Sequence, residues 1–368
     1  MSSIQRISRW QFVMLLLPIV IATEILPVTD LSAKFAHQRT WLAMIPATLT
    51  GIWSIWVMTE LARRHPGQSI IQYAMDILGK WGGRAFGVII ILQTFIYTTK
   101  VAAEMMTFIS MFALPRTPKP MILGLFLFAC GVAVWAGIEV IARCAETFIP
   151  ITITFFLFVF ICLLPNMRPA YVRPVLGPDW FETVIQAAIV PSAWYGEFLL
   201  MGFLLPFLET SKNVRRMSYY LLTFIGVFVV MIALQSTMVA GPLIEKLTYS
   251  YYITARYISL GDFFERIDPL IISIWMYGLV VKEAVCLFVF ATCVTQLTGL
   301  SDHRLIVMPV TILTMIGCLW MFPNLAELRS FLTYTFPIEG MVVQNILPTF
   351  LLAVDMLRRG LDRSPAHA

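Results

Sequence analysis

Long apolar runs dominate the chain, and charged residues gather at their ends. A helix that crosses the hydrocarbon core of a bilayer needs about 20 mostly apolar residues. Ten runs meet this requirement, and they leave little sequence for a soluble domain. The pattern predicts ten membrane-spanning helices over residues 10–32, 41–62, 84–113, 119–138, 143–165, 182–208, 216–240, 269–297, 304–322 and 334–357.

Composition supports a membrane protein. Hydrophobic residues make up 59% of the 368 residues and charged residues 13%, whereas soluble domains carry about 25% charged residues. We therefore expect an all-α integral membrane protein with a single domain over 1–368. The first run is too long for the core of a signal peptide, so we expect it to be retained.

The basic residues predict the orientation. An even number of spans places both termini on one side, and that side carries fourteen Lys and Arg residues against ten on the other. Cytoplasmic loops are enriched in Lys and Arg, so both termini are predicted to be cytoplasmic. The net charge of +5 is scattered over helix ends, where it anchors helices to lipid headgroups, and nucleic-acid binding is not expected.

Catalytic and metal-binding patterns are not found. The six cysteines lie in or beside apolar runs without a CxxC pair, and the four histidines fall in loops or the tail. Neither HExxH nor GxSxG occurs. We expect no enzymatic activity, no cofactor and no metal site.

Two of the predicted helices carry matching interruptions. The first contains 22–27 (Ala-Thr-Glu-Ile-Leu-Pro), and the sixth contains 191–197 (Pro-Ser-Ala-Trp-Tyr-Gly-Glu). Proline removes a backbone hydrogen bond and glycine has low helix propensity. Broken helices at equivalent positions of two inverted halves indicate a substrate site near the bilayer midplane. The halves would be five-helix repeats over about 10–165 and 182–357. The alternative is that the prolines only kink these helices.

Two loops contain amphipathic stretches at equivalent positions of these halves. Residues 65–78 present Ile70, Ile71, Ala74 and Ile77 on one helical face and Gln72 and Asp76 on the other. Residues 249–265 repeat the pattern with Tyr249, Tyr252, Ile253, Tyr257 and Leu260 before Asp262 and Glu265. The first stretch is predicted to lie in the cytoplasmic interface.

Six charged residues lie deep inside the spans, where an unpaired charge costs about 2.5–3.5 kcal/mol. They are Glu24, Lys100, Glu104, Glu197, Lys282 and Glu283. Lys100 and Glu104 are spaced to pair along one helix, or they could serve an ion or ligand site. Lys282 is predicted to be a fixed cation near the first break, with Glu24 as its partner. Glu283 points elsewhere and could pair with another span.

The candidate ligand-binding residues surround the two breaks. They are Thr23, Glu24, Ile25, Tyr97, Trp194, Tyr195, Gly196 and Glu197. Among them, Glu197 is the strongest candidate for ligand recognition, because a carboxylate beside a helix break can accept hydrogen bonds from a ligand ammonium. The alternative is that Glu197 only caps the second half of the broken helix.

Several short segments recur along the chain in a characteristic order and spacing. They are Leu26-Pro27, His65-Pro66-Gly67-x-Ser69, Leu78-Gly79-Lys80-Trp81-Gly82, Arg173-Pro174-Val175-Leu176-Gly177, Gly196-Glu197, Leu205-Pro206-Phe207, and Phe264-Glu265-Arg266-Ile267-Asp268 ahead of Trp275. In these segments the chain resembles the endospore germination permeases, the B-type subunits of spore nutrient-germinant receptors within the amino acid, polyamine and organocation transporter superfamily. One departure is Glu24, because relatives tend to have small residues, often glycines, around the first break.

This resemblance implies a ten-helix inverted-repeat fold in the inner membrane of the spore. It also implies assembly with an A-type membrane subunit and a C-type lipoprotein, and a role in sensing a nutrient, such as an amino acid, that triggers germination. The alternative function is secondary transport of an amino acid coupled to a proton or sodium gradient. The residues leave open which amino acid, sugar or ion is recognised.

Overall fold

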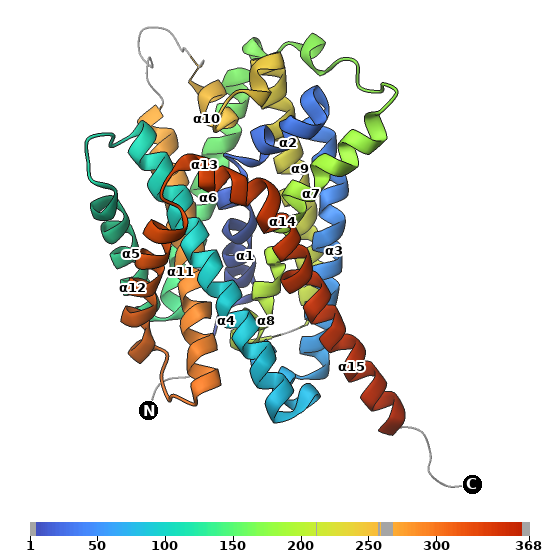
Figure 1. Cartoon of the computed structure of the whole chain (residues 1–368), viewed down its shortest axis with the longest axis vertical. Helices are drawn as coiled ribbons and strands as arrows, with labels where there is room; N and C mark the ends of the chain where they lie inside the picture. Colours follow the sequence, from blue (N-terminus) through green and yellow to red (C-terminus); the bar gives the residue numbers. More distant parts are fainter. Residues whose placement is uncertain (1–4, 211, 257, 259–267, 363–368) are drawn as a thin grey trace.

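The computed structural model describes residues 5–210, 212–256, 258 and 268–362. These residues form a bundle of helices (Figure 1). The α-helices are α1 (Arg9–Glu24), α2 (Val28–Ala36), α3 (Thr40–Arg64), α4 (Ile70–Phe112), α5 (Lys119–Ala136), α6 (Ile138–Leu163), α7 (Trp180–Gly196), α8 (Met201–Leu204), α9 (Val214–Ala240), α10 (Ser250–Ala255), α11 (Asp268–Thr298), α12 (Arg304–Met321), α13 (Leu325–Ser330), α14 (Phe336–Glu339) and α15 (Leu347–Asp362).

Nine stretches of the described chain are long and apolar enough to cross a membrane. The predicted first span does not reach this length because it is divided into α1, with 16 residues, and α2, with 9. The count of ten spans and the five-plus-five repeat therefore remain predictions. The all-helical membrane architecture is confirmed.

The bundle has an inner and an outer layer. In the most apolar 18-residue segments within 180–207 and 269–298, 89% of the residues are buried. In the corresponding segments of α5 and α12, 33% and 28% of the residues are buried. Large apolar side chains such as Phe128 and Trp320 point outward at 70% and 81% exposure. Lipid is the natural solvent for such a surface. Residues 14–24 of α1 are also all buried. Both helices that carry a predicted break therefore lie in the inner layer, where a polar site needs protein partners.

Both predicted helix breaks are present. Helix α1 ends at Glu24, residues 25–27 form a turn, and α2 begins after Pro27, whose ring removes a backbone donor. Helix α7 continues through Pro191 and ends at Gly196, where the chain tightens into the 3₁₀ segment η4 (Glu197–Leu200). The α-helical pattern is therefore interrupted at both predicted positions, by a three-residue turn after α1 and by a change to 3₁₀ geometry after α7, where Gly196 and Glu197 keep right-handed helical dihedral angles.

The first amphipathic stretch is the opening of α4. Ser69 caps it, the predicted apolar face is buried, and Gln72 and Asp76 are exposed. Gly79 has a φ of 77°, which favours glycine, and separates this piece from the long apolar part of α4. For the second stretch, α10 includes Tyr252 and Ile253, while Tyr257, Leu260, Asp262 and Glu265 lie outside the described residues.

Ion pairs link neighbouring helices at both ends of the bundle. At the end where α3 finishes, Glu60 accepts hydrogen bonds from Arg63, Arg64 and Arg215. Asp355 is 4% exposed and pairs there with Arg64. At the opposite end, a second set of contacts joins α2 to α13 and α10. Asp30 Oδ2 lies 2.6 Å from Arg329 Nη1, and Asp30 Oδ1 accepts the Ser250 amide at 3.2 Å.

Candidate functional site

The two helix breaks face each other inside the bundle. The indole nitrogen of Trp194, on the last turn of α7, donates to Thr23 Oγ1 near the end of α1 at 2.9 Å. On the other side of α1, the indole nitrogen of Trp275 in α11 donates to the Ala22 carbonyl oxygen at 2.6 Å. All four residues are buried. Two tryptophan donors therefore hold the end of α1 between α7 and α11.

A buried chain of three charges crosses this junction. Glu197 Oε1 lies 2.7 Å from Lys100 Nζ, and Glu197 Oε2 lies 2.6 Å from Lys282 Nζ. Lys282 also donates to Thr23 Oγ1 at 2.6 Å. All three charged residues are at most 1% exposed. Because each buried lysine contacts the same carboxylate, Glu197 acts as a shared counter-ion that joins α4, the break after α7, and α11.

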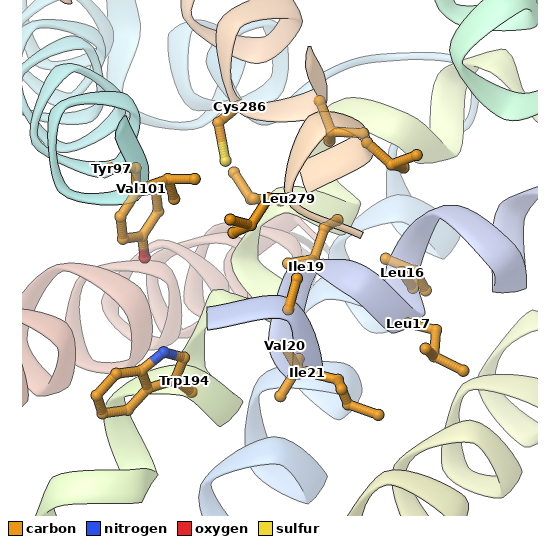
Figure 2. Packing of buried hydrophobic residues seen from close by; sticks show 14 of the residues in the cluster. Leu16, Leu17, Ile19, Val20, Ile21, Tyr97, Val101, Trp194, Leu279 and Cys286 are labelled. Carbon is orange, nitrogen blue, oxygen red and sulfur yellow. The ribbon is translucent and has the colours of Figure 1, made fainter. Parts of the chain in front are cut away.

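Aromatic rings surround the Lys100 end of this chain. The ammonium nitrogen lies 3.9 Å from the centre of the Phe336 ring, 5.3 Å from the Trp194 ring and 5.8 Å from the Tyr97 ring. Ring faces attract cations, and the attraction strengthens where water is excluded. Tyr97 and Trp194 belong to the cluster of buried hydrophobic residues that also contains Ile19 and Val20 of α1 (Figure 2).

Three buried carboxylates are not used by this network. Within the described part of the chain, neither oxygen of Glu24 or Glu283 has a hydrogen-bond partner, and Oε1 of Glu104 has none. Glu24 interacts electrostatically with Glu197, Lys282 and Tyr195. A carboxylate without donors at this depth is costly when charged, so these three groups differ from Glu197, whose oxygens both accept from lysines.

The structure corrects three pairing predictions. Lys100 pairs with Glu197 and not with Glu104, which lies on its own helix. Lys282 pairs with Glu197 and Thr23 and not with Glu24. Both oxygens of Glu197 contact lysine ammonium groups, and no side chain caps η4 through a hydrogen bond. Glu283 has no hydrogen-bond partner among the described residues, although it interacts electrostatically with Lys100 of α4.

The other predicted residues lie at the same junction. Ile25 is buried in the turn after α1, and Tyr97, Tyr195 and Gly196 are buried around the second break. A Cβ on Gly196 would overlap Oε1 of Gln344, so the glycine allows the π-helical turn η9 (Gly340–Ile346) to approach the break.

Sequence reasoning missed a set of polar and aromatic residues that complete the junction. They are Gln93, Trp275, Phe336, Glu339, Gln344 and Asn345. Gln344 and Asn345 could have been found as adjacent polar residues inside an apolar run, whereas a single tryptophan or phenylalanine carries no such signal. No group of three or more metal-ligating side chains was found in a search limited to the described residues.

Comparison with known sequences identifies the family. The model for the family described as spore germination protein matches residues 6–325. The Bacillus subtilis protein YfkT is 25% identical over 332 residues, which cover 88% of this chain and 89% of that protein. Spore germination protein XB of Bacillus anthracis is 24% identical over 67% of this chain and 69% of its own. Spore germination protein KB of Bacillus subtilis is 24% identical over 74% and 73%.

Comparison with solved structures identifies the fold. The crystal structure of MhsT in complex with L-phenylalanine superposes with a TM-score of 0.70 at 14% identity, covering 96% of this chain and 99% of MhsT. Mhp1, a nucleobase-cation-symport-1 family transporter in a closed conformation with bromovinylhydantoin bound, gives 0.60 at 12% identity over 94% and 78%. The fold is therefore shared with a membrane transporter, and the family match over most of the length shows that this chain is a member of the spore germination protein family.

Proposed function

We propose that this chain is the membrane subunit of a nutrient-germinant receptor and binds a zwitterionic amino acid between the breaks of α1 and α7. The observation that carries this proposal is the meeting of two broken helices at the buried Lys100–Glu197–Lys282 chain. A folded protein rarely keeps such charges inside a membrane bundle unless they serve a ligand or ion.

The junction offers different binding partners to the carboxylate and to the ammonium group of an amino acid. Helix α2 starts after Pro27 and has no side-chain cap, so its first amides are available to a ligand carboxylate. The ammonium groups of Lys100 and Lys282 beside Glu197 attract the same group. The ligand ammonium then requires a carboxylate or carbonyl oxygens at the breaks, and Glu24 and Glu197 are the carboxylates placed there.

The alternative function is secondary transport of an amino acid coupled to a proton or sodium gradient. The shared fold with a symport-family transporter favours this reading. Counterflow of labelled amino acid into liposomes that contain only this chain would demonstrate transport. Ligand binding without flux would support the receptor.

The proposed receptor includes partners and a location. We infer assembly with an A-type membrane subunit and a C-type lipoprotein in the spore inner membrane, because the relatives carry spore germination names. We also infer that both termini are cytoplasmic. Labelling of cysteines introduced at Ser3 and Ala366 tests the orientation, and reaction of either one from the outer face of intact cells would contradict it.

A ligand screen tests the central claim. A ligand that binds only the folded state raises apparent thermal stability, so the purified chain should be stabilised by at least one member of a panel of amino acids and sugars. Stabilisation by amino acids supports the proposed site. Stabilisation by sugars alone would contradict the amino-acid assignment, and stabilisation by no member would count against binding by this chain.

A further inference from the structure

Both oxygens of Glu197 are already occupied. Oε1 contacts Lys100 and Oε2 contacts Lys282, at 2.7 and 2.6 Å. A ligand ammonium that bound Glu197 would be a third cation on one carboxylate, in a site that is at most 1% exposed. It would lie beside two buried lysine ammonium groups, whose like charges repel it. Glu197 is therefore suited to hold the two lysines and poorly suited to receive a ligand cation.

Glu24 has the opposite properties. It is the last residue of α1, directly at the break, and it is fully buried. In the described structure, neither of its oxygens has a hydrogen-bond partner. The two residues before it already accept hydrogen bonds. The Ala22 carbonyl oxygen accepts from Trp275. Thr23 Oγ1 accepts from Trp194 and Lys282. The carboxylate of Glu24 is thus the free acceptor at this break.

The neighbourhood favours an organic ammonium over a metal ion as the missing partner. A metal cation bound by oxygens requires several of them, and the oxygens of Ala22 and Thr23 beside Glu24 are used by donors. An ammonium group brings its own N–H donors and needs acceptors only. The hydroxyl of Tyr195, which interacts electrostatically with Glu24 and is unpartnered within the described residues, adds a second polar group.

We propose that Glu24 binds the ammonium group of the ligand, while Glu197 serves as the internal counter-ion of Lys100 and Lys282. The site then selects ligands that carry a free amino group next to a carboxylate. The ammonium goes to Glu24, and the carboxylate goes toward the side of Lys100 and Lys282. This assignment rests on the proposed amino-acid-binding function and adds the residue that recognises the amino group.

Glu283 provides a matched control. It is also fully buried, and neither of its oxygens is hydrogen-bonded to another described residue. Like Glu24, it interacts electrostatically with Lys282, but it lies in the middle of the continuous helix α11 and not at the end of a helix. Its other electrostatic neighbours include the thiols of Cys130 and Cys318 on α5 and α12. A loss of binding caused merely by removing a buried carboxylic acid should therefore appear in Glu283→Gln as well as in Glu24→Gln.

The test measures binding to the purified full-length chain. The probes are the twenty common L-amino acids, each paired with its N-acetyl derivative, which keeps the carboxylate and side chain but lacks the ammonium. The amino acid that stabilises the wild type most is then titrated into Glu24→Gln and Glu283→Gln. We expect N-acetylation to abolish stabilisation, Glu24→Gln to raise the Kd at least tenfold, and Glu283→Gln to change it less than twofold. If Glu24→Gln does not fold, Glu24→Asp keeps the charge and should retain discrimination against the N-acetyl probe.

Several results would overturn the assignment. An unchanged Kd in a folded Glu24→Gln protein, or equal binding of the free and N-acetylated amino acid, would refute the role of Glu24 and leave the proposed function standing. Failure of every amino acid to bind would refute both the role of Glu24 and the proposed function. Stabilisation by sodium chloride but not choline chloride, present in the wild type and absent in Glu24→Gln, would assign Glu24 to a metal cation instead.

Discussion

Replacing Glu197 by glutamine removes the carboxylate to which both Lys100 and Lys282 donate hydrogen bonds. Glutamine has the same shape, but its single carbonyl oxygen can accept from Lys100 or from Lys282, and its amide nitrogen faces the other ammonium with a donor. Removing one partner of a buried ion pair costs about 3–5 kcal/mol. Since all three residues are at most 1% exposed, solvent cannot screen the loss. We therefore expect Glu197→Gln to destabilise the protein by about this amount.

The expected change in melting temperature follows from the size of the chain. An unfolding entropy of about 2.1 cal/mol/K per residue, applied to 368 residues, converts this loss into a decrease of about 4–6 °C. The assay is thermal unfolding of purified wild type and variant in the same detergent. Glu283→Gln is the control, because it removes a carboxyl group of equal burial that has no hydrogen-bond partner in the described structure.

A double-mutant cycle separates the pair energy from other effects. Lys282→Met replaces the second lysine by an apolar side chain of similar length, so the combination with Glu197→Gln should cost less than the sum of the two single changes. The reasoning also predicts that Glu197→Gln weakens the germinant response of spores that carry normal amounts of the protein. Unchanged melting temperature and unchanged dose response in both Glu197→Gln and Glu197→Ala would refute the shared counter-ion.

Three further changes test other parts of the structure. Lys282→Met alone should reduce ligand-dependent thermal stabilisation several-fold while protein abundance is kept, and an unchanged ligand response would count against a fixed cation beside the first break. Gly196→Ala places a methyl group against Gln344 and should cost about 1–3 kcal/mol, measured as a lower melting temperature; a neutral effect would mean that η9 can move away from the break. Asp30→Asn weakens the ion pair with Arg329 and should increase hydrogen–deuterium exchange over α2. Unchanged exchange would show that this ion pair does not hold α2 against α13.

The membrane architecture could be predicted from the chain because its cause is local. Each span needs its own apolar length, independent of which helix it packs against, and the predicted runs coincide with most of the helices. The two breaks were also predictable, since Pro27 and Gly196 disturb a helix through their own backbones. The buried face of 70–78 followed from helical periodicity in the same way.

The partners inside the bundle depended on the tertiary structure. Sequence spacing favoured Lys100 with Glu104, four residues apart, yet the fold pairs Lys100 with Glu197, 97 residues away, and brings Lys282 to the same carboxylate across 85 residues. Spacing along one helix says which side chains could meet, but the packing of α4, α7 and α11 decides which charges lie within hydrogen-bond distance. The same packing leaves both oxygens of Glu24 without a hydrogen-bond partner among the described residues. The sequence places these charges inside the membrane, and only the assembled helices determine which of them are paired.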